Sequence, residues 1–547
     1  MKKYIKYLIA VCVTLTAGGC KKDLNLVNKS AYTYDTFFTS DAAINQGVIA
    51  DYATFLHVGL WAREWYYIFD LMGYDAKNDA ALQGDLLGLA QYNFSANQPQ
   101  LDAMWASLYR MILRSNVVIN RAQAWTPANT TEQAHQKQYI AEAKFLRAYA
   151  YFNLVNLYGR VPLRTDYQPQ PTSDQINLPR TAVADIWAFV EKDLKDAETD
   201  LPLSYAATDY GRATKGAATA LLGKSYLYEK KWTDAVAELT KLTQPPFTYA
   251  LAPQYNDLFD DPNQDDPGKN PETILQVMNQ AWTDWGIGNQ YYLFGGEEVW
   301  GGKATHSARA QEYGFNDWSN TFITTTAVKA FTYPNPQTNA TYVDPRAAYT
   351  FYGDAASGGQ TAYCQSCAIS SSIPKVPIPY PYKYDANGNL ITATTGYHWL
   401  KYEYYNKVES FGGPQSGING QVIRYADVLL MLAEAYIQQG NTGGQPLALI
   451  NQVRSRPSVN APLYTSLGGQ SQAMTILMRE RQLELTGEQS RYFDLIRWGI
   501  AKQTINSERQ AEDGTQPFQD KNVLLPIPIS EKNANPNVAK DIGGDWN

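Results

Sequence analysis

The sequence is poor in the residues that build metal centres. Its 547 residues include four cysteines and four histidines, and the histidines (His57, His135, His306 and His398) are scattered along the chain. A structural zinc site needs four cysteine or histidine ligands at short spacings, so we expect no metal cluster and no cofactor. The sequence also lacks the motifs of phosphate-binding loops, zinc proteases and serine hydrolases. These absences predict a protein that is not an enzyme.

Clusters of positive charge are missing as well. Charged residues make up 18% of the chain, and 46 basic residues are outnumbered by 53 acidic ones. Three of the lysines also lie in the first seven residues, which read as a removable leader. Nucleic-acid binding depends on a cationic surface, so nucleic acid is excluded as an expected partner.

Long apolar runs are scarce, and the run nearest the N-terminus is short. Residues 1–7 are basic, and LIAVCVTLTAGG follows them, which is the layout of a secretory signal. The run is too short to span a bilayer. It ends at Cys20, after Ala17-Gly18-Gly19, and resembles a bacterial lipobox. We expect residues 1–19 to be the signal peptide and Cys20 to carry the lipid anchor; a plain signal peptide is the alternative.

Two further cysteines, Cys364 and Cys367, lie in YCQSC. One Cys-x-x-Cys pair is half of a zinc ribbon, and its Gly-, Ser- and Pro-rich flanks do not match a strand–turn–helix redox motif. We predict a local disulfide, with free thiols and then a metal site as the alternatives.

Helical repeats dominate much of the chain. In residues 213–246, Leu222-Gly223, Tyr226 and Ala235 fit tetratricopeptide spacing, and Gly223 and Ala235 are small enough for two helices to approach closely. RYADVLLMLAEAYIQQG begins a second copy, and AKFLRAYAYFNLVNLYG is a looser third. Such repeats predict a scaffold that presents a binding surface.

Between the helical blocks, residues 246–400 are rich in Pro, Gly, Asn, Tyr and Trp. KYDANGNLIT predicts a hairpin with Asn387-Gly388 at the turn. SIPKVPIPYPY cannot form a central strand because its prolines lack the donors that pair with a neighbour. Long loops held by a rigid frame are a common place for binding residues.

Several of these motifs occur together in a familiar order. The lipobox followed by KKDLN, then AEAKFLRAYAYFNLVNLYGRVPL, RYADVLLMLAEAY, RERQLELTGEQSRYFDLIRWG and LLPIPISEKNANPNV resemble the SusD/RagB family of Bacteroidetes outer-membrane lipoproteins. The resemblance implies a mostly α fold, in which a scaffold of tetratricopeptide-like hairpins carries a loop-rich, partly β insert. The expected parts of this single SusD-like unit (20–547) are an N-terminal segment with a ligand-side loop (20–100), helices (101–245), a ligand-binding region (246–400) and a C-terminal repeat with tail (401–547).

The resemblance also implies a function. Members are surface-exposed on the outer membrane, capture glycan and deliver it to a SusC-like TonB-dependent transporter, which they cap as a lid. RagB-type relatives serve peptide uptake, so a peptide- or protein-binding role is the alternative. The C-terminal AKDIGGDWN departs from the ending that the family often has.

Aromatic residues in the middle region are the main candidates for ligand contact. Residues 281–302, AWTDWGIGNQYYLFGGEEVWGG, combine six aromatics with six glycines. Flat aromatic rings with polar tips suit the apolar faces and hydroxyl edges of sugars. By analogy with the family, the candidate ligand residues are Asp75, Asn78, Asp79, Tyr92, Trp282, Trp285, Tyr291, Tyr292 and Trp300. Core packing is the open alternative for each tryptophan.

Other conspicuous residues have a structural interpretation. Trp61, Trp65 and Phe69 lie at helical spacing and are expected in the core, and Trp318 is expected to be structural. The adjacent Glu297-Glu298 cannot flank a glycosidic bond from both sides.

Two charged stretches are the remaining candidates for a structural or metal-binding role. In RERQLELTGEQSRYFDLIRWG, helical spacing predicts the pairs Glu488–Arg491 and Arg491–Asp494, with Phe493, Ile496 and Trp498 packed inward as a structural clamp. DDPNQDD, residues 260–266, is a candidate calcium loop without EF-hand spacing.

Overall fold

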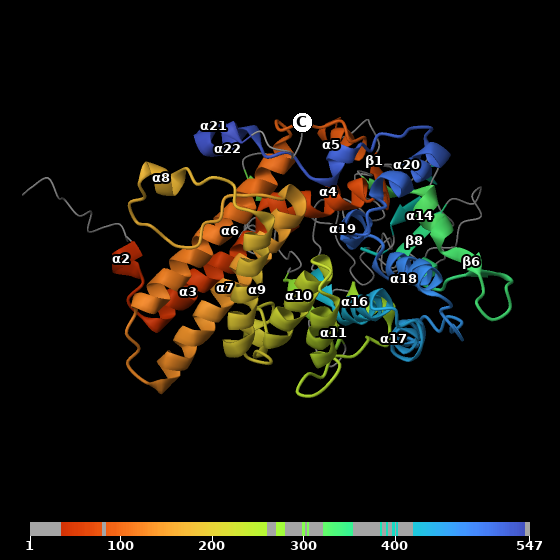
Figure 1. The fold of residues 1–547 in the computed structure, drawn as a ribbon, viewed down its shortest axis with the longest axis horizontal. Helices are drawn as coiled ribbons and strands as arrows, with labels where there is room; N and C mark the ends of the chain where they lie inside the picture. The colour runs from red at the N-terminus through yellow and green to blue at the C-terminus, as the bar shows by residue number, and fades with distance from the viewer. Residues whose placement is uncertain are drawn as a thin grey trace, which may run out of the picture.

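Helices dominate the molecule, and the strands are few and short (Figure 1). The computed structural model describes residues 34–78, 84–259, 270–278, 298–300, 303–305, 321–353, 383–384, 390–391, 397–399, 401–402 and 419–541. The expectation of a mostly α fold is therefore confirmed.

The N-terminal half of the chain supplies the long helices. They and the short turns between them are α2 (Tyr34–Phe37), α3 (Asp41–Tyr52), η1 (Ala53–Leu56), η2 (Val58–Ala62), α4 (Glu64–Met72), α5 (Gly84–Ala90), α6 (Pro99–Ala124), α7 (Thr130–Tyr158), α8 (Ser173–Ile176), α9 (Val183–Asp200), η3 (Ala207–Asp209), α10 (Lys215–Tyr228), α11 (Trp232–Lys241) and η4 (Tyr255–Leu258). Polar caps start several of them: the Asn129 side chain accepts from the Glu132 amide at the start of α7, and Thr214 does the same for Ala217 at the start of α10.

The C-terminal half is helical again after a region of short strands. Its helices are α14 (Thr325–Ala330), α15 (Ala347–Thr350), α16 (Tyr425–Gln438), α17 (Gly444–Arg454), α18 (Gln470–Leu485), α19 (Ser490–Arg497), α20 (Ala501–Glu512), η6 (Asp520–Val523), α21 (Ile529–Ala534) and α22 (Pro536–Lys540). The strands are β1 (Ala76–Asn78), β2 (Thr273–Val277), β3 (Glu298–Trp300), β4 (Lys303–Thr305), β5 (Thr321–Ile323), β6 (Thr332–Pro334), β7 (Thr341–Val343), β8 (Phe351–Gly353), β9 (Lys383–Tyr384), β10 (Leu390–Ile391), β11 (Tyr397–Trp399) and β12 (Gly420–Arg424).

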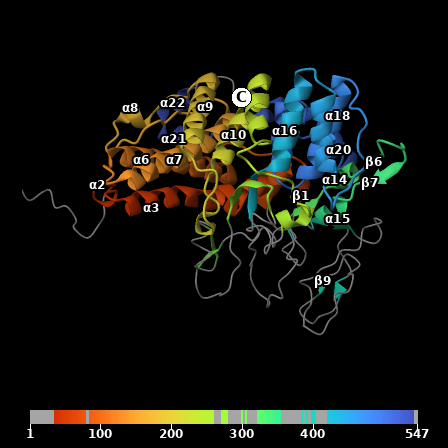
Figure 2. The ribbon, with the colours of Figure 1, turned by 90° about the horizontal axis from the view of Figure 1, so that it is seen from below.

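The helices pack in sequence as one array. α6 packs on α7, α7 on α9, α9 on α10 and α10 on α11, and α11 then packs directly on α16, which contacts α17 and α18. In the turned view α9, α10, α16 and α18 stand in a row, and β1 and α15 lie below them (Figure 2). Because α11 and α16 touch, the chain leaves the array near residue 242 and returns to the same place at residue 425.

Helical hairpins occur where the repeat spacing predicts them. α10 and α11 form the first, and α16 and α17 form the second. A side-chain carbon at Gly223 would lie 2.5 Å from Leu239 Cδ2, so glycine is what allows α10 and α11 to approach this closely. The hairpin in KYDANGNLIT is also confirmed, because β9 and β10 pair with Leu390 opposite Tyr384.

The strands form one small sheet and four two-stranded pairs among the described residues. The four-stranded sheet has the order β1-β5-β11-β8, and the pairs are β2 with β12, β3 with β4, β6 with β7 and β9 with β10. All of these pairings are antiparallel.

The core extends through both halves of the chain. Trp65 is 4% exposed and Phe69 is fully buried, whereas Trp61 is half-buried and stacks on Trp65 with ring centroids 6.3 Å apart. The expectation of core positions is confirmed for Trp65 and Phe69. Trp61 lies at the edge of the core.

Gly59 marks the closest backbone approach between η2 and α6. A side-chain carbon there would lie 2.1 Å from the carbonyl oxygen of Ala103 and 2.6 Å from the amide nitrogen of Met104. Both neighbours are backbone atoms of a long helix, so neither can move alone. We expect Gly59→Ala to lower the free energy of unfolding by about 3 kcal/mol, at the upper end of overpacking costs, as measured by urea denaturation.

Gly443 provides the matched control. It has no atom within 4 Å of the added carbon and a negative φ of −104°. Gly443→Ala should change stability by less than about 1 kcal/mol. Equal effects of the two substitutions would contradict the steric explanation for Gly59.

Candidate ligand-binding site

The two segments that carry the candidate ligand residues meet in the four-stranded sheet. β1 follows the N-terminal helices, and β5, β11 and β8 belong to the middle region; Asn78 of β1 lies opposite Thr321 of β5. Two further bonds close the junction, because the Thr324 amide donates to the Asp75 carbonyl at 3.0 Å and the Thr324 hydroxyl to the Tyr74 carbonyl at 2.9 Å. The structure thus brings the start of the N-terminal loop beside the middle region.

Two of the candidate ligand residues lie in the core instead of facing solvent. Asp75 is 2% exposed, and its carboxylate pairs with the Arg491 guanidinium at 3.1 Å. Burial raises the pKa of Asp75 to about 6, against the opposing effect of Arg491. Tyr92 is 6% exposed; its hydroxyl donates to the Met72 carbonyl, and its ring meets that of Phe518 at 4.9 Å. In this structure both side chains hold the N-terminal segment in place.

Asn78 and Trp300 lie on strands. Asn78 ends β1 and is half-buried. Trp300 ends β3 and lies opposite Lys303 of β4, so Gly301-Gly302 join the two strands. A Gly-Gly pair is typical of a two-residue hairpin turn, a signal in the sequence that the aromatic content obscured.

The remaining candidates lie outside the described residues. They are Cys20, Asp79, Trp282, Trp285, Tyr291, Tyr292, Cys364 and Cys367, together with Trp318 and the acidic stretch 260–266. Among the residues that the structure describes, no group of three or more His, Cys, Asp or Glu side chains could hold a metal ion.

A small cavity of about 70 Å³ lies where the N-terminal helices meet β12 and α19. Trp61, Trp65 and Phe493 are among the residues that line it, and the Trp61 indole donates to the Tyr149 hydroxyl at 3.2 Å. Its charged lining is paired, since Lys224 meets Asp427 at 3.2 Å. The size suits a few water molecules, so this cavity is a packing junction rather than a candidate for a whole sugar.

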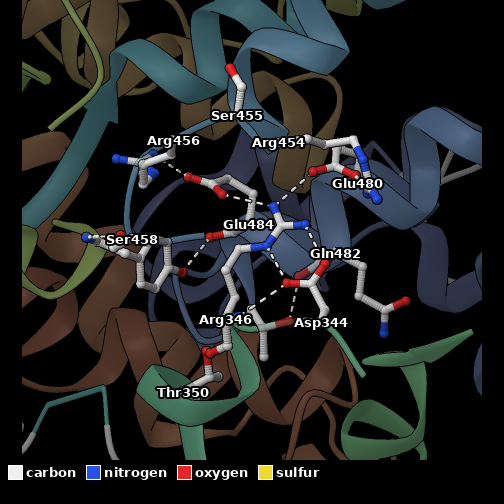
Figure 3. A network of polar contacts seen from close by, with 12 residues as sticks. Asp344, Arg346, Thr350, Arg454, Ser455, Arg456, Ser458, Glu480, Gln482 and Glu484 are labelled. Carbon is white, nitrogen blue, oxygen red and sulfur yellow. Dashed lines mark hydrogen bonds and ion pairs between the residues drawn. The ribbon is translucent and has the colours of Figure 1, made fainter. Parts of the chain in front are cut away.

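A buried charge network lies beneath the middle region (Figure 3). Carboxylates and cations are equal in number in it, and each side chain is at most 6% exposed. Its members are Glu272, Asp344, Glu480, Glu484, Glu488, Arg346, Lys401, Arg424, Arg454 and Arg456. The balance of charge and the dense hydrogen bonding are what allow ions to be buried at all.

Glu484 of α18 is the centre of this network. Its two carboxylate oxygens accept from Arg346 at 2.9 Å and from Arg424 and Arg456 at 2.7 Å each. Three guanidinium groups hold the pKa of Glu484 well below its usual range, although burial alone would raise it. Glu484 is therefore ionised at any physiological pH.

The network fastens the middle region to α18. Four of its members belong to the segment between α11 and α16: Glu272 precedes β2, Arg346 precedes α15, Lys401 follows β11 and Arg424 ends β12. Each of them reaches Glu484, Glu488 or a cation that does. Segments far apart in sequence thus have a common anchor on α18 and the turn that follows it.

Lys401 is the network member whose charge is sensitive to pH. Burial lowers the pKa of its ammonium from 10.5 to about 8, helped by Arg424 and opposed by Glu488 at 2.5 Å. The unfolded chain keeps this proton up to a pH near 10.5, so above pH 8 the unfolded state binds more protons than the folded state. Stability from this group must therefore rise with pH between these two values.

As the pH rises above 8, we expect the free energy of unfolding of the wild type to increase relative to that of Lys401→Met. The difference should grow by up to ~1.4 kcal/mol per pH unit. Urea titrations at pH 8 and at about pH 9.5 measure this difference. A Lys502→Met variant, which alters an exposed lysine paired with Asp520, serves as control. Its free energy of unfolding should change with pH as that of the wild type does. If the free energy of unfolding of Lys401→Met changed with pH as that of the wild type does, the lowered pKa of Lys401 would be contradicted.

The charged run in residues 479–499 is structural, but its predicted pairs are wrong. Glu488 binds Lys401 and Arg424, Arg491 binds Asp75 and Glu508, and Asp494 binds Arg481 and Arg497. Gln489 has a positive φ of 59° and breaks the helix between α18 and α19, so Glu488 and Arg491 do not share a helix face. Phe493, Ile496 and Trp498 pack against the core, as expected.

Sequence reasoning missed the network itself. Its members are spread from residue 272 to residue 488, and most of the pairs join elements far apart in sequence. Charged residues at helical spacing are the usual signal of exposed ion pairs, and spacing of that kind carries no information about partners in distant segments.

Two family models match the chain. One, described as the SusD family, matches residues 271–543, and the other, described as "starch-binding associating with outer membrane", matches residues 30–227. A SusD-like protein P2 from Formosa agariphila is 26% identical over 98% of this chain and 99% of its own length. A SusD-like protein from Bacteroides ovatus is 25% identical over 90% of this chain and 82% of its own length.

Solved structures have the same fold. A SusD-like carbohydrate-binding protein from Bacteroides fragilis covers 92% of this chain with a TM-score of 0.73 at 22% identity, over its full length. A laminarin-binding SusD-like protein covers 92% with a TM-score of 0.66 at 23% identity, also over its full length. Within the described part of the chain, no helix combines the length and apolarity needed to cross a membrane.

Proposed function

The chain belongs to the SusD family, and on that premise we propose that it is a glycan-binding lipoprotein of the outer-membrane surface. It captures oligo- or polysaccharide and passes it to a SusC-like TonB-dependent transporter, for which it acts as the lid. The lipid on Cys20 keeps it at the membrane. Catalysis has no part in this role, and the family descriptions support it by naming binding and no reaction.

One structural observation carries the proposal. The sheet β1-β5-β11-β8 joins the N-terminal loop to the middle region, so residues from both segments can contribute to one binding surface. The buried charge network in turn fixes Lys401 and Arg424 of the middle region, which supports a rigid mount for such a surface. A rigid mount for aromatic side chains lowers the entropy lost when a sugar binds.

The glycan class is supported by the aromatic residues. Trp282, Trp285, Tyr291, Tyr292 and Trp300 lie within twenty residues of one another, and Asn78 and Asp79 would supply hydrogen-bond partners for hydroxyls. A structural relative binds laminarin, and another is described as carbohydrate-binding, which supports the same class of ligand for this chain.

Two experiments test the proposal. The first measures binding of the purified protein to a panel of polysaccharides by affinity electrophoresis, and to a panel of mixed peptides by fluorescence polarisation. The second captures the tagged protein from solubilised outer membranes of its own host and identifies what is bound. We expect retardation by at least one polysaccharide, no peptide binding, and capture of a TonB-dependent transporter in near-equal amount.

The outcomes separate the parts of the proposal. Peptide binding without glycan binding would replace the glycan function with the RagB-like one. A failure to capture any transporter from intact host membranes would contradict the lid role while leaving glycan binding to the first experiment.

A further inference from the structure

A hollow of about 420 Å³ lies between α18 and α20. α14 and α19 each pack on both of these helices and close the space between them. Its floor includes Asp75, Arg491 and Asp494. The volume lies within the range of small-ligand sites, which is roughly 300–1,000 Å³. We refer to this space as the α18–α20 hollow.

One face of each helix lines the hollow. Thr475, Arg479 and Gln482 follow each other along α18 at the spacing of one helix face, and Thr504 and Glu508 do so along α20. The opposite side of α18 carries Glu480 and Glu484, which belong to the buried charge network. The Gln482 side chain turns away from these carboxylates in Figure 3. The network therefore fixes one wall of the hollow.

Several polar groups in this wall have no partner among the residues that the structure describes. The Gln482 amide, the Ser490 hydroxyl and the Thr504 hydroxyl line the hollow, and no described residue bonds to their side chains. They are half-buried, so each donor or acceptor is partly withdrawn from water. Polar groups in such positions are normally satisfied by protein, by ordered water or by a ligand.

Arg479 supplies the uncompensated positive charge. Its guanidinium lies over the Tyr333 ring at 5.1 Å and forms no ion pair within the described part of the chain. The other two arginines of the hollow are engaged, since Arg481 pairs with Asp494 at 2.7 Å and Arg491 with Asp75 at 3.1 Å. A guanidinium can bind a carboxylate through two parallel hydrogen bonds, so an anionic ligand group would suit Arg479.

Glu508 supplies a buried acceptor. One of its oxygens pairs with Arg491 at 2.6 Å, and the other is buried without any hydrogen-bond partner. An orphaned carboxylate oxygen beside a hollow requires a donor from whatever fills that hollow. Arg491 also pairs with Asp75, so Glu508 shares this cation with a second carboxylate, and its free oxygen can accept a hydrogen bond from a ligand hydroxyl.

Apolar side chains complete the lining. Met478 of α18 and Ile500, next to α20, are half-buried and face the same space, and Leu485 and Leu495 lie deeper. A ligand with hydroxyls on its edge and C–H groups on its faces would satisfy both kinds of surface.

We propose that the α18–α20 hollow binds one acidic sugar unit, with the sugar carboxylate on Arg479 and a sugar hydroxyl donating to the free oxygen of Glu508. This inference does not depend on the proposed function. A neutral sugar leaves Arg479 without an anion. An α-amino acid such as alanine has a carboxylate for Arg479 but no hydroxyls for the polar groups of Gln482, Ser490 and Thr504.

The test uses the purified full-length protein and D-glucuronate as the probe, with D-glucose and L-alanine for comparison, followed by isothermal titration calorimetry. We expect a dissociation constant on the order of 1 mM for glucuronate, as is usual for a ligand of about a dozen atoms. Glucose and alanine should bind at least ~10-fold more weakly.

Two substitutions locate the site. Arg479→Gln keeps a planar amide but removes the charge, and we expect a ~10-fold loss of glucuronate affinity. Lys329→Gln removes one charge from the neighbouring α14; Lys329 is exposed and does not line the hollow, so affinity should be retained. The variant Trp282→Ala/Trp285→Ala/Trp300→Ala should also bind glucuronate normally.

Each other outcome overturns the proposal. If Arg479→Gln binds glucuronate as well as the wild type, or if the triple tryptophan variant abolishes binding, the acidic sugar binds elsewhere. If glucose or alanine binds as tightly as glucuronate, the ligand class is wrong. If glucuronate binds more weakly than about 50 mM, the hollow does not bind such a ligand.

Discussion

Replacing Glu484 by glutamine should lower the free energy of unfolding by about 3–5 kcal/mol, the cost that follows when one partner is removed from a buried ion network. The carboxylate of Glu484 meets three arginines that are themselves at most 1% exposed. Glutamine has nearly the same shape, so the substitution removes charge and leaves packing almost unchanged. Urea denaturation followed by far-ultraviolet circular dichroism measures the difference.

The size of this effect comes from the groups left behind. Arg346, Arg424 and Arg456 would share a network with one fewer negative charge, and the glutamine NH₂ group would compete as a donor where only acceptors are needed. The control is Asp520→Asn, because the Lys502–Asp520 pair is exposed at 54% and 88%. That substitution should cost less than about 1 kcal/mol. A similar cost for Glu484→Gln would show that the network contributes little to stability.

The second large effect concerns ligand binding. We expect the variant Trp282→Ala/Trp285→Ala/Trp300→Ala to lose glycan affinity by ~100-fold or more, since each aromatic platform contributes roughly 1 kcal/mol or more and every 1.4 kcal/mol is a factor of ten. Affinity electrophoresis against the polysaccharide that binds the wild type measures the change. Circular dichroism must show that the variant keeps its helices.

The matched control removes tryptophans of the helix array. Trp125 at the end of α6 and Trp232 at the start of α11 are both half-buried and lie outside the middle region. The double variant Trp125→Ala/Trp232→Ala should bind the polysaccharide as the wild type does. Retained binding by the triple variant would remove these three residues from the site and return them to the alternative of core packing.

Local patterns were enough to predict the helical frame. Small residues at Gly223 and Ala235, with Leu222 and Leu239 in the seam, indicate two closely packed helices, and α10 and α11 have this arrangement. The same holds for the hairpin in KYDANGNLIT, whose two strands pair as the sequence predicts. Information of this kind is contained in the segment that folds.

Side-chain environments were harder to predict. Asp75 and Tyr92 have the composition of ligand residues, yet α19 and the C-terminal segment cover them through Arg491 and Phe518. Glu488 and Arg491 are at helical spacing, and the left-handed residue Gln489 separates them. In the first case, contacts with residues more than four hundred positions away outweigh the local pattern. In the second case, a single backbone dihedral does so.

The direct packing of α11 on α16 has a consequence for how such proteins diversify. About a third of the chain leaves the helix array and re-enters it at the same place, so its length and composition can change without moving a helix. A replacement segment would need to retain Glu272, Arg346, Lys401 and Arg424, together with the pairing of β5 with β1 and the packing of α14 on α18 and α20. New ligand preferences can therefore evolve, or be engineered, by exchanging the parts of this segment between those contacts while the helical frame remains unchanged.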